Sequence, residues 1–248
     1  MTNRAHLRVV PPDAGPVPCM PDPLLYDNRS DFFDAFWAAG GDHAHVDRLD
    51  WEWERHERAR RRLRRLRKNA PPGLMAPGDA EAIALRKYER SAAVRLVMEW
   101  SQKAAADPRA PRILVMLGPP DAGKTFAALC WMAETCGRYV KERELCRLSR
   151  ASWGEEATTY AALLREERLV IDEVDPNRID RELALRVMMD VVDDRKGGDS
   201  RTIIIANATR AEFVAHRADP KLESRLKAYA RVEVVIDDPR RPDRGELL

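Results

Sequence analysis

The sequence of 248 residues has little cysteine and no long hydrophobic run. The four cysteines form no C-x2-C pair, and no pair of histidines completes a zinc spacing, so we expect free thiols in a reducing compartment. The longest apolar runs, near 113–117 and 202–206, are far shorter than the ~18 residues that span a bilayer. Because the first twelve residues also lack a stretch suited to a signal peptide, the sequence predicts a cytoplasmic protein with no membrane partner. The cysteines are Cys19, Cys130, Cys136 and Cys146.

An excess of charge of one sign is also lacking, since 43 basic and 41 acidic residues give a net charge of +2. This balance excludes a uniformly basic nucleic-acid coat, so the distribution of charge matters more than its sum. Lysine is scarce, with 8 residues against 35 arginines. Arginine favours planar, bidentate contacts with phosphate and carboxylate, although a coding bias would produce the same excess.

Composition divides the chain into three expected parts. Residues 1–26 are rich in proline and lack periodicity, which predicts a disordered or extended tail. Residues 27–77 are expected to form a small helical N-terminal region that ends in a linker of proline and glycine. Residues 78–248 alternate between helical patterns and short apolar strands, which is typical of an α/β domain.

Two helices are expected in the N-terminal region, one over 31–39 with Ser30 as its cap and one over 46–68. The second helix ends in a run of eight basic side chains without an acidic one. This run could bind DNA phosphates, with Trp51 and Trp53 stacking on bases. It could instead dock on a protein partner, or form the solvated face of a helix that packs on its own domain.

The α/β part is expected to contain a parallel sheet covered by helices on both faces. Two helix starts have clear signals. Glu212 stands three residues after Thr209, as in a capping box, and Asp219 precedes Pro220 at a first helical position. A long helix is expected over 79–106. The predicted strands span 112–117, 138–141, 168–172, 201–206 and 231–236.

A phosphate-binding loop is the strongest motif. Residues 118–125 read GPPDAGKT and fit G-x4-G-K-[ST] between a predicted strand and a predicted helix. Glycines let the backbone wrap closely so that N–H groups and the helix N-terminus face phosphate. Lys124 is expected to reach the β- and γ-phosphates, and the Thr125 hydroxyl to bind Mg²⁺. A purely structural turn is the alternative. The expected nucleotide contacts are Gly118, Pro119, Pro120, Asp121, Ala122, Gly123, Lys124, Thr125, Phe126 and Asp172.

Two adjacent carboxylates follow the apolar strand that ends near residue 172. Because functional groups gather at the carboxyl ends of parallel strands, these side chains should face the phosphate-binding loop. We expect Asp172 to hold Mg²⁺, and Glu173 to orient the attacking water or accept its proton. A turn or helix cap after a core strand is the alternative interpretation.

Two further residues are candidates for contacts with the γ-phosphate. Asn207 follows a predicted strand and could hydrogen-bond the γ-phosphate or the water, or it could simply start an Asx turn. Arg225 lies on a predicted helix and could reach the nucleotide of a neighbouring subunit, where an arginine raises phosphoryl-transfer rates by orders of magnitude. A solvated surface arginine is the alternative.

In this order, the motifs resemble the AAA+ ATPases of the DnaC/IstB type over about residues 79–241. That group includes replicative-helicase loaders and the ATPase subunits of transposition systems. The resemblance implies a P-loop NTPase core of three layers with a five-stranded parallel sheet, and Mg²⁺-dependent hydrolysis of ATP. It also implies roles for Lys124 and Thr125 (Walker A), Asp172 and Glu173 (Walker B), Asn207 (sensor 1) and Arg225 (an arginine finger acting in trans).

The resemblance implies an oligomeric helicase loader of a phage or mobile element, which assembles on single-stranded DNA and grips a hexameric replicative helicase through its N-terminal region. A transposition ATPase that binds duplex DNA and a transposase is the alternative. Glu173 argues against an adaptor that binds ATP without hydrolysing it. Two features depart from the family pattern: Asp121 and Ala122 replace its usual Gly-x, and the sequence offers no separate C-terminal lid domain with a clear sensor 2 arginine. Arg240 and Arg241 follow the last predicted strand and have no assigned role.

Overall fold

The computed structural model describes residues 20–21, 23–75, 78–84, 91–175, 180–195, 199–216 and 219–234. Most of the predicted tail therefore lies outside the described residues, as do Arg240 and Arg241. The chain forms two compact units, residues 1–61 and residues 62–248, and each is described by itself. None of the described helices is long and apolar enough to cross a bilayer.

The first unit contains helix α1 (Arg29–Ala38) and the beginning of helix α2 (Val46–Asn69). Short 3-10 turns stand at Pro23–Leu25 and His43–His45. The predicted cap at Ser30 is wrong, because Asn28 has the extended backbone of a cap and its side chain accepts a hydrogen bond from the Asp31 N–H at 2.9 Å.

The core of this unit consists of four side chains, two from α1 and two from α2: Phe32, Phe36, Leu49 and Trp53. Trp53 is only 7% exposed, and its ring centroid lies 5.4 Å from that of Phe32. The expectation that Trp53 stacks on bases is therefore wrong, because the indole is needed for the core. Trp51 is half-buried, with the Arg55 guanidinium 5.4 Å from its ring centroid.

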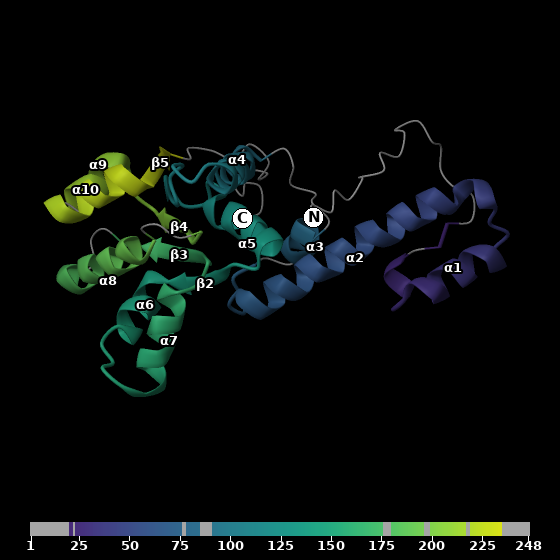
Figure 1. The fold of residues 1–248 in the computed structure, drawn as a ribbon, viewed down its shortest axis with the longest axis horizontal. Helices are drawn as coiled ribbons and strands as arrows, with labels where there is room; N and C mark the ends of the chain where they lie inside the picture. Colours follow the sequence, from purple (N-terminus) through teal and green to yellow (C-terminus); the bar gives the residue numbers. More distant parts are fainter. Residues whose placement is uncertain are drawn as a thin grey trace, which may run out of the picture. The chain divides into compact units, whose positions relative to one another are not determined.

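The second unit contains a five-stranded parallel sheet with the strand order β2-β3-β4-β1-β5, which confirms the predicted α/β class. Every residue of the neighbouring strands β1 and β4 is buried, as expected when helices cover both faces of a sheet. The strands are β1 (Ile113–Leu117), β2 (Arg138–Lys141), β3 (Arg168–Val174), β4 (Arg201–Ala206) and β5 (Ala230–Val234) (Figure 1).

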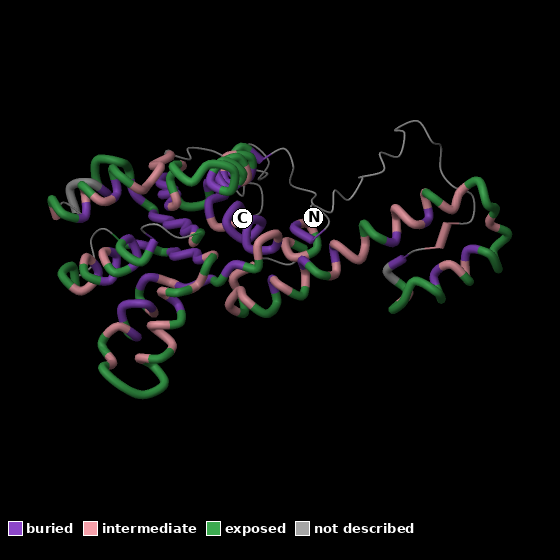
Figure 2. Tube along the Cα trace, viewed as in Figure 1, coloured by how far each residue is buried: buried purple, intermediate pink, exposed green. Residues whose placement is uncertain are grey.

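Alternate residues of β1, β2, β3 and β4 pack into two separate hydrophobic clusters. In β1, Leu114 and Met116 join the cluster with α4 and α5, whereas Ile113 and Val115 join the cluster with α6, α8 and α10. The helices are α3 (Asp79–Ala84), α4 (Ala92–Ala106), α5 (Lys124–Thr135), α6 (Glu142–Leu148), α7 (Gly154–Leu164), α8 (Arg181–Asp194), α9 (Arg210–His216) and α10 (Pro220–Tyr229). The sheet is the buried middle of three layers, as predicted (Figure 2).

Local capping explains where several helices begin. In the predicted capping box, the Thr209 N–H donates to Glu212 at 2.7 Å and the Glu212 N–H to the Thr209 hydroxyl at 3.2 Å. Asp219 caps α10 and Pro220 begins it, also as predicted. A single helix over 79–106 is wrong, because Ser91 has an extended backbone and caps a new helix through the Val94 N–H.

Candidate nucleotide-binding site

The loop between β1 and α5 turns through residues with positive φ. Gly118 has φ 143° and Gly123 has φ 80°, conformations that glycine adopts without a side-chain clash. Asp121, at the position where the family pattern has Gly-x, has φ 64°, a left-handed conformation that aspartate tolerates better than most residues. The Gly118 N–H also donates to the carbonyl of Ala208 at 3.1 Å, which ties the loop to the end of β4.

Lys124 begins α5 and lies inside this loop. Its side chain is 3% exposed, and Nζ donates to the carbonyls of Gly118 at 2.9 Å and Pro119 at 2.5 Å. Burial lowers the pKa of Lys124 from its ordinary value, while the charges of Asp172 and Asp121 oppose the shift. The loop thus holds a buried amine whose ammonium form an anionic ligand would favour.

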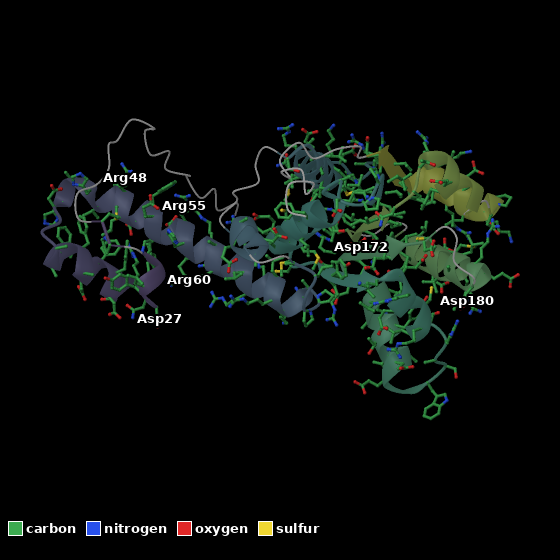
Figure 3. All side chains as sticks on the ribbon, turned by 180° about the vertical axis from the view of Figure 1, so that it is seen from behind. Asp27, Arg48, Arg55, Arg60, Asp172 and Asp180 are labelled. Carbon is green, nitrogen blue, oxygen red and sulfur yellow. The ribbon has the colours of Figure 1, made fainter. Side chains whose placement is uncertain are left out.

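Asp172, near the end of β3, is buried, and both of its carboxylate oxygens accept hydrogen bonds (Figure 3). Its Oδ2 accepts hydrogen bonds from the Thr125 hydroxyl at 2.8 Å and the Tyr139 hydroxyl at 3.0 Å. Its Oδ1 accepts from the N–H of Glu173 at 2.6 Å. The fold therefore brings Asp172 and Thr125 together across 47 residues of sequence, and adds a tyrosine from β2.

Glu173 has an unusual backbone and a basic partner. Its φ of 55° coincides with an irregularity in the pairing of β3 with β4 between Ile171 and Val174. Its side chain is 46% exposed, and Oε1 lies 2.5 Å from Nζ of Lys141 on β2. In this conformation Glu173 is paired with an ammonium group.

Sequence reasoning missed both Tyr139 and Lys141, because neither belongs to a contiguous motif. The sequence could have indicated them only if the short predicted strand at 138–141 had been placed next to the strand that ends at Asp172. In the parallel pairing, Lys141 stands opposite Asp172. Burial, the charge of Asp172 and the hydrogen bond that Asp172 accepts all raise the pKa of Tyr139, so this hydroxyl stays protonated and remains a donor.

A cavity of about 350 Å³ joins these groups. Most of the predicted nucleotide contacts line this cavity. Leu74 and Asp79, which come before β1 in the sequence and belong to no motif, also line it. Gly118 and Pro119 do not line the cavity, but their carbonyls accept hydrogen bonds from Nζ of Lys124, which does. The lining residues are Leu74, Asp79, Pro120, Asp121, Ala122, Gly123, Lys124, Thr125, Phe126, Tyr139, Asp172, Glu173 and Asn207.

Arg225 lies elsewhere. Its Nε forms an ion pair with Asp193 of α8 at 2.7 Å, and it is not among the residues that line the cavity. Its Nη1 is buried and has no hydrogen-bond acceptor within the part of the chain that the structure describes.

The residues of the cavity fit a nucleoside triphosphate with Mg²⁺. The Thr125 hydroxyl and the Asp172 carboxylate are oxygen ligands of the kind that Mg²⁺ takes together with phosphates and waters. Lys124 and the N-terminus of α5, a helix of 12 residues, supply positive charge beside them.

A family model for IstB-like ATP binding proteins matches residues 41–238. The chain belongs to this family. The predicted resemblance to ATPases of the DnaC/IstB type is thereby confirmed, and ATP is the nucleotide that membership of this ATP-binding family implies for the cavity.

Two solved structures are similar to this IstB-like protein at low identity. The crystal structure of the DnaC helicase loader is 17% identical, with 57% of this chain and 88% of that chain covered and a TM-score of 0.46. The crystal structure of DnaI is 13% identical, with 59% and 84% covered and a TM-score of 0.41. Among curated proteins no match was found.

Proposed function

We propose that this IstB-like protein hydrolyses ATP with Mg²⁺ and uses the cycle to load a hexameric replicative helicase onto single-stranded DNA. The observation that carries the ATPase is the hydrogen bond from Thr125 to Asp172 beside the buried amine of Lys124. These groups stand at the carboxyl edge of the sheet, where ligands of α/β folds bind.

In this proposal, the loop N–H groups and Lys124 bind the β- and γ-phosphates. Thr125 and Asp172 would hold Mg²⁺, which would supply positive charge against the charge that develops on the phosphates. Tyr139 keeps Asp172 in place through its hydrogen bond of 3.0 Å. Asp172 in turn accepts from the N–H of Glu173, so the two acids are fixed relative to each other.

Glu173 acts as the base that orients the attacking water and takes its proton, after its ion pair with Lys141 opens. Asn207, which lines the same cavity, hydrogen-bonds the water or the γ-phosphate. Arg225 acts on the nucleotide of a neighbouring copy, which requires self-association. For that role its ion pair with Asp193 would open, which would free the guanidinium for an anion of another subunit.

The helicase is expected to bind the N-terminal region, residues 27–77, while residues 78–248 form the ATPase domain. The aromatic core of the first unit supports this for residues up to 61, because it allows a small helical module to present a fixed surface. Residues from 62 onward belong to the second unit, where Leu66 joins the cluster with α5. The family description, IstB-like, favours a second candidate with the same core, a transposition ATPase that binds duplex DNA and a transposase.

Two variants test the ATPase. Lys124→Ala should abolish nucleotide binding, and Glu173→Gln should bind ATP without turning it over. Unchanged ATP turnover in both variants would refute the assignment.

For Arg225, mixing Arg225→Ala with Glu173→Gln should restore part of the activity, because each copy supplies what the other lacks. Capture of a helicase or of a transposase, together with the relative affinity for single and double strands, distinguishes the two candidate functions.

A further inference from the structure

The eight basic side chains of the run at 58–68 do not share one role. Arg60, in the first unit, donates to the carbonyls of Pro23 and Tyr26. Arg62 pairs with Glu134 at 2.6 Å and donates to the carbonyl of Ala84. Those arginines satisfy acceptors of their own unit, so they are not available to a partner.

Arg65 also has an internal role, since it donates to the last carbonyls of α5, at Ala133 and Glu134, over 3.1 and 3.0 Å. Leu66, next to it, is fully buried in the cluster that contains α5. One side of this part of α2 is thus fixed to the helix that carries Lys124.

The opposite side carries three exposed cations, Arg64, Arg67 and Lys68, which we call the basic face. Within the part of the chain that the structure describes, no carboxylate forms an ion pair with any of them. The helix itself offers none, because the last acidic residue of α2 is Glu57.

The three side chains stand at i, i+3 and i+4, so they are neighbours on the helix surface and repel one another. The helix dipole favours cations in the last turn, which accounts for Arg67 and Lys68 but not for Arg64, which lies before that turn. The repulsion among these clustered like charges is unfavourable in the isolated protein. A bound anion would turn it into a favourable attraction.

We propose that the basic face binds the phosphate backbone of the nucleic acid on which this protein acts. Guanidinium groups match phosphate in a bidentate manner, and side chains about 5–6 Å apart on one helix can contact neighbouring phosphates of a strand. This inference rests on the proposed function for the identity of the anion, but it assigns the contact to residues that the nucleotide cavity does not contain.

The test is a triple variant, Arg64→Gln, Arg67→Gln and Lys68→Gln, since glutamine keeps the helix propensity of the side chains it replaces. A matched control is the triple variant Lys103→Gln, Arg109→Gln and Lys221→Gln, which removes the same charge from exposed sites elsewhere in the same unit. Binding to a labelled 20-nucleotide single strand and to its duplex is measured by fluorescence anisotropy over a series of salt concentrations.

Loss of three phosphate contacts makes the negative slope of log K against log salt shallower, by about 2 for a single strand and by about 2.7 for a duplex. Over the tenfold range from 1 M to 0.1 M salt, a slope change of about 2 corresponds to about 100-fold weaker binding at 0.1 M. The control variant should keep the wild-type slope, and both variants should bind ATP as the wild type does.

A wild-type slope in the first triple variant would overturn the proposal while leaving the ATPase intact. Absence of wild-type binding to either oligonucleotide would also overturn it, and would leave an acidic protein surface as the occupant of this face. Loss of ATP binding in Lys124→Ala is scored separately, so failure of the ATPase assignment is distinguishable from failure of this inference.

Discussion

The ion pair between Lys141 and Glu173 should restrain ATP hydrolysis, and Lys141→Met tests this. The two side chains are 27% and 46% exposed and their charged atoms lie 2.5 Å apart. A pair with this exposure contributes about 0.5–1 kcal/mol, because solvent screens it and ordering two side chains costs entropy. Methionine keeps the length and apolar stem of lysine and removes the charge.

Releasing about 0.5–1 kcal/mol raises the population of unpaired Glu173 by about two- to fivefold. We therefore expect the rate of the chemical step, measured in a single-turnover assay with excess protein over ATP, to rise by about the same factor. The left-handed φ of Glu173 belongs to the backbone and is unchanged by the substitution.

Lys103→Met serves as the control, since Lys103 is exposed on α4 and does not line the cavity. ATP affinity and melting temperature are measured alongside, to separate catalysis from binding and folding. A single-turnover rate for Lys141→Met that equals or falls below the wild-type rate, with ATP affinity unchanged, would refute the idea that the ion pair holds Glu173 inactive.

Three other outcomes are expected. Tyr139→Phe should increase the Mg²⁺ concentration needed for half-maximal ATPase activity by about three- to tenfold, because a hydrogen bond to buried Asp172 is lost; an unchanged Mg²⁺ titration would contradict this. Because the pKa of Lys124 is lowered before the nucleotide binds, ATP affinity should fall as pH rises toward 10, whereas Lys124→Arg should bind ATP with little pH dependence over that range. Leu66→Ala should lower the free energy of unfolding by about 2–5 kcal/mol in urea titrations, against a smaller loss for half-buried Leu63→Ala.

Features that depend on neighbours along the chain could be read from the sequence. The loop over 118–125, the paired acids at the end of a strand and the capping box at Thr209 each lie within a few residues, and their chemistry follows from short-range geometry. The apolar strands alternating with helical patterns predicted the parallel sheet, because such strands need cover on both faces. The wrong helix starts were local errors too. Asn28 caps α1 and Ser91 caps α4, where the sequence alone predicted other starting points.

Features that depend on which elements are neighbours in space were decided by the tertiary structure. Tyr139 and Lys141 reach the two acids only because β2 pairs with β3 in the sheet. Trp53 is buried because α1 packs on α2, and the basic run divides because one side of α2 packs on α5. A helical or alternating pattern specifies that a face is buried, but the partner that buries it is fixed by the free energy of packing the whole chain, which no single segment contains.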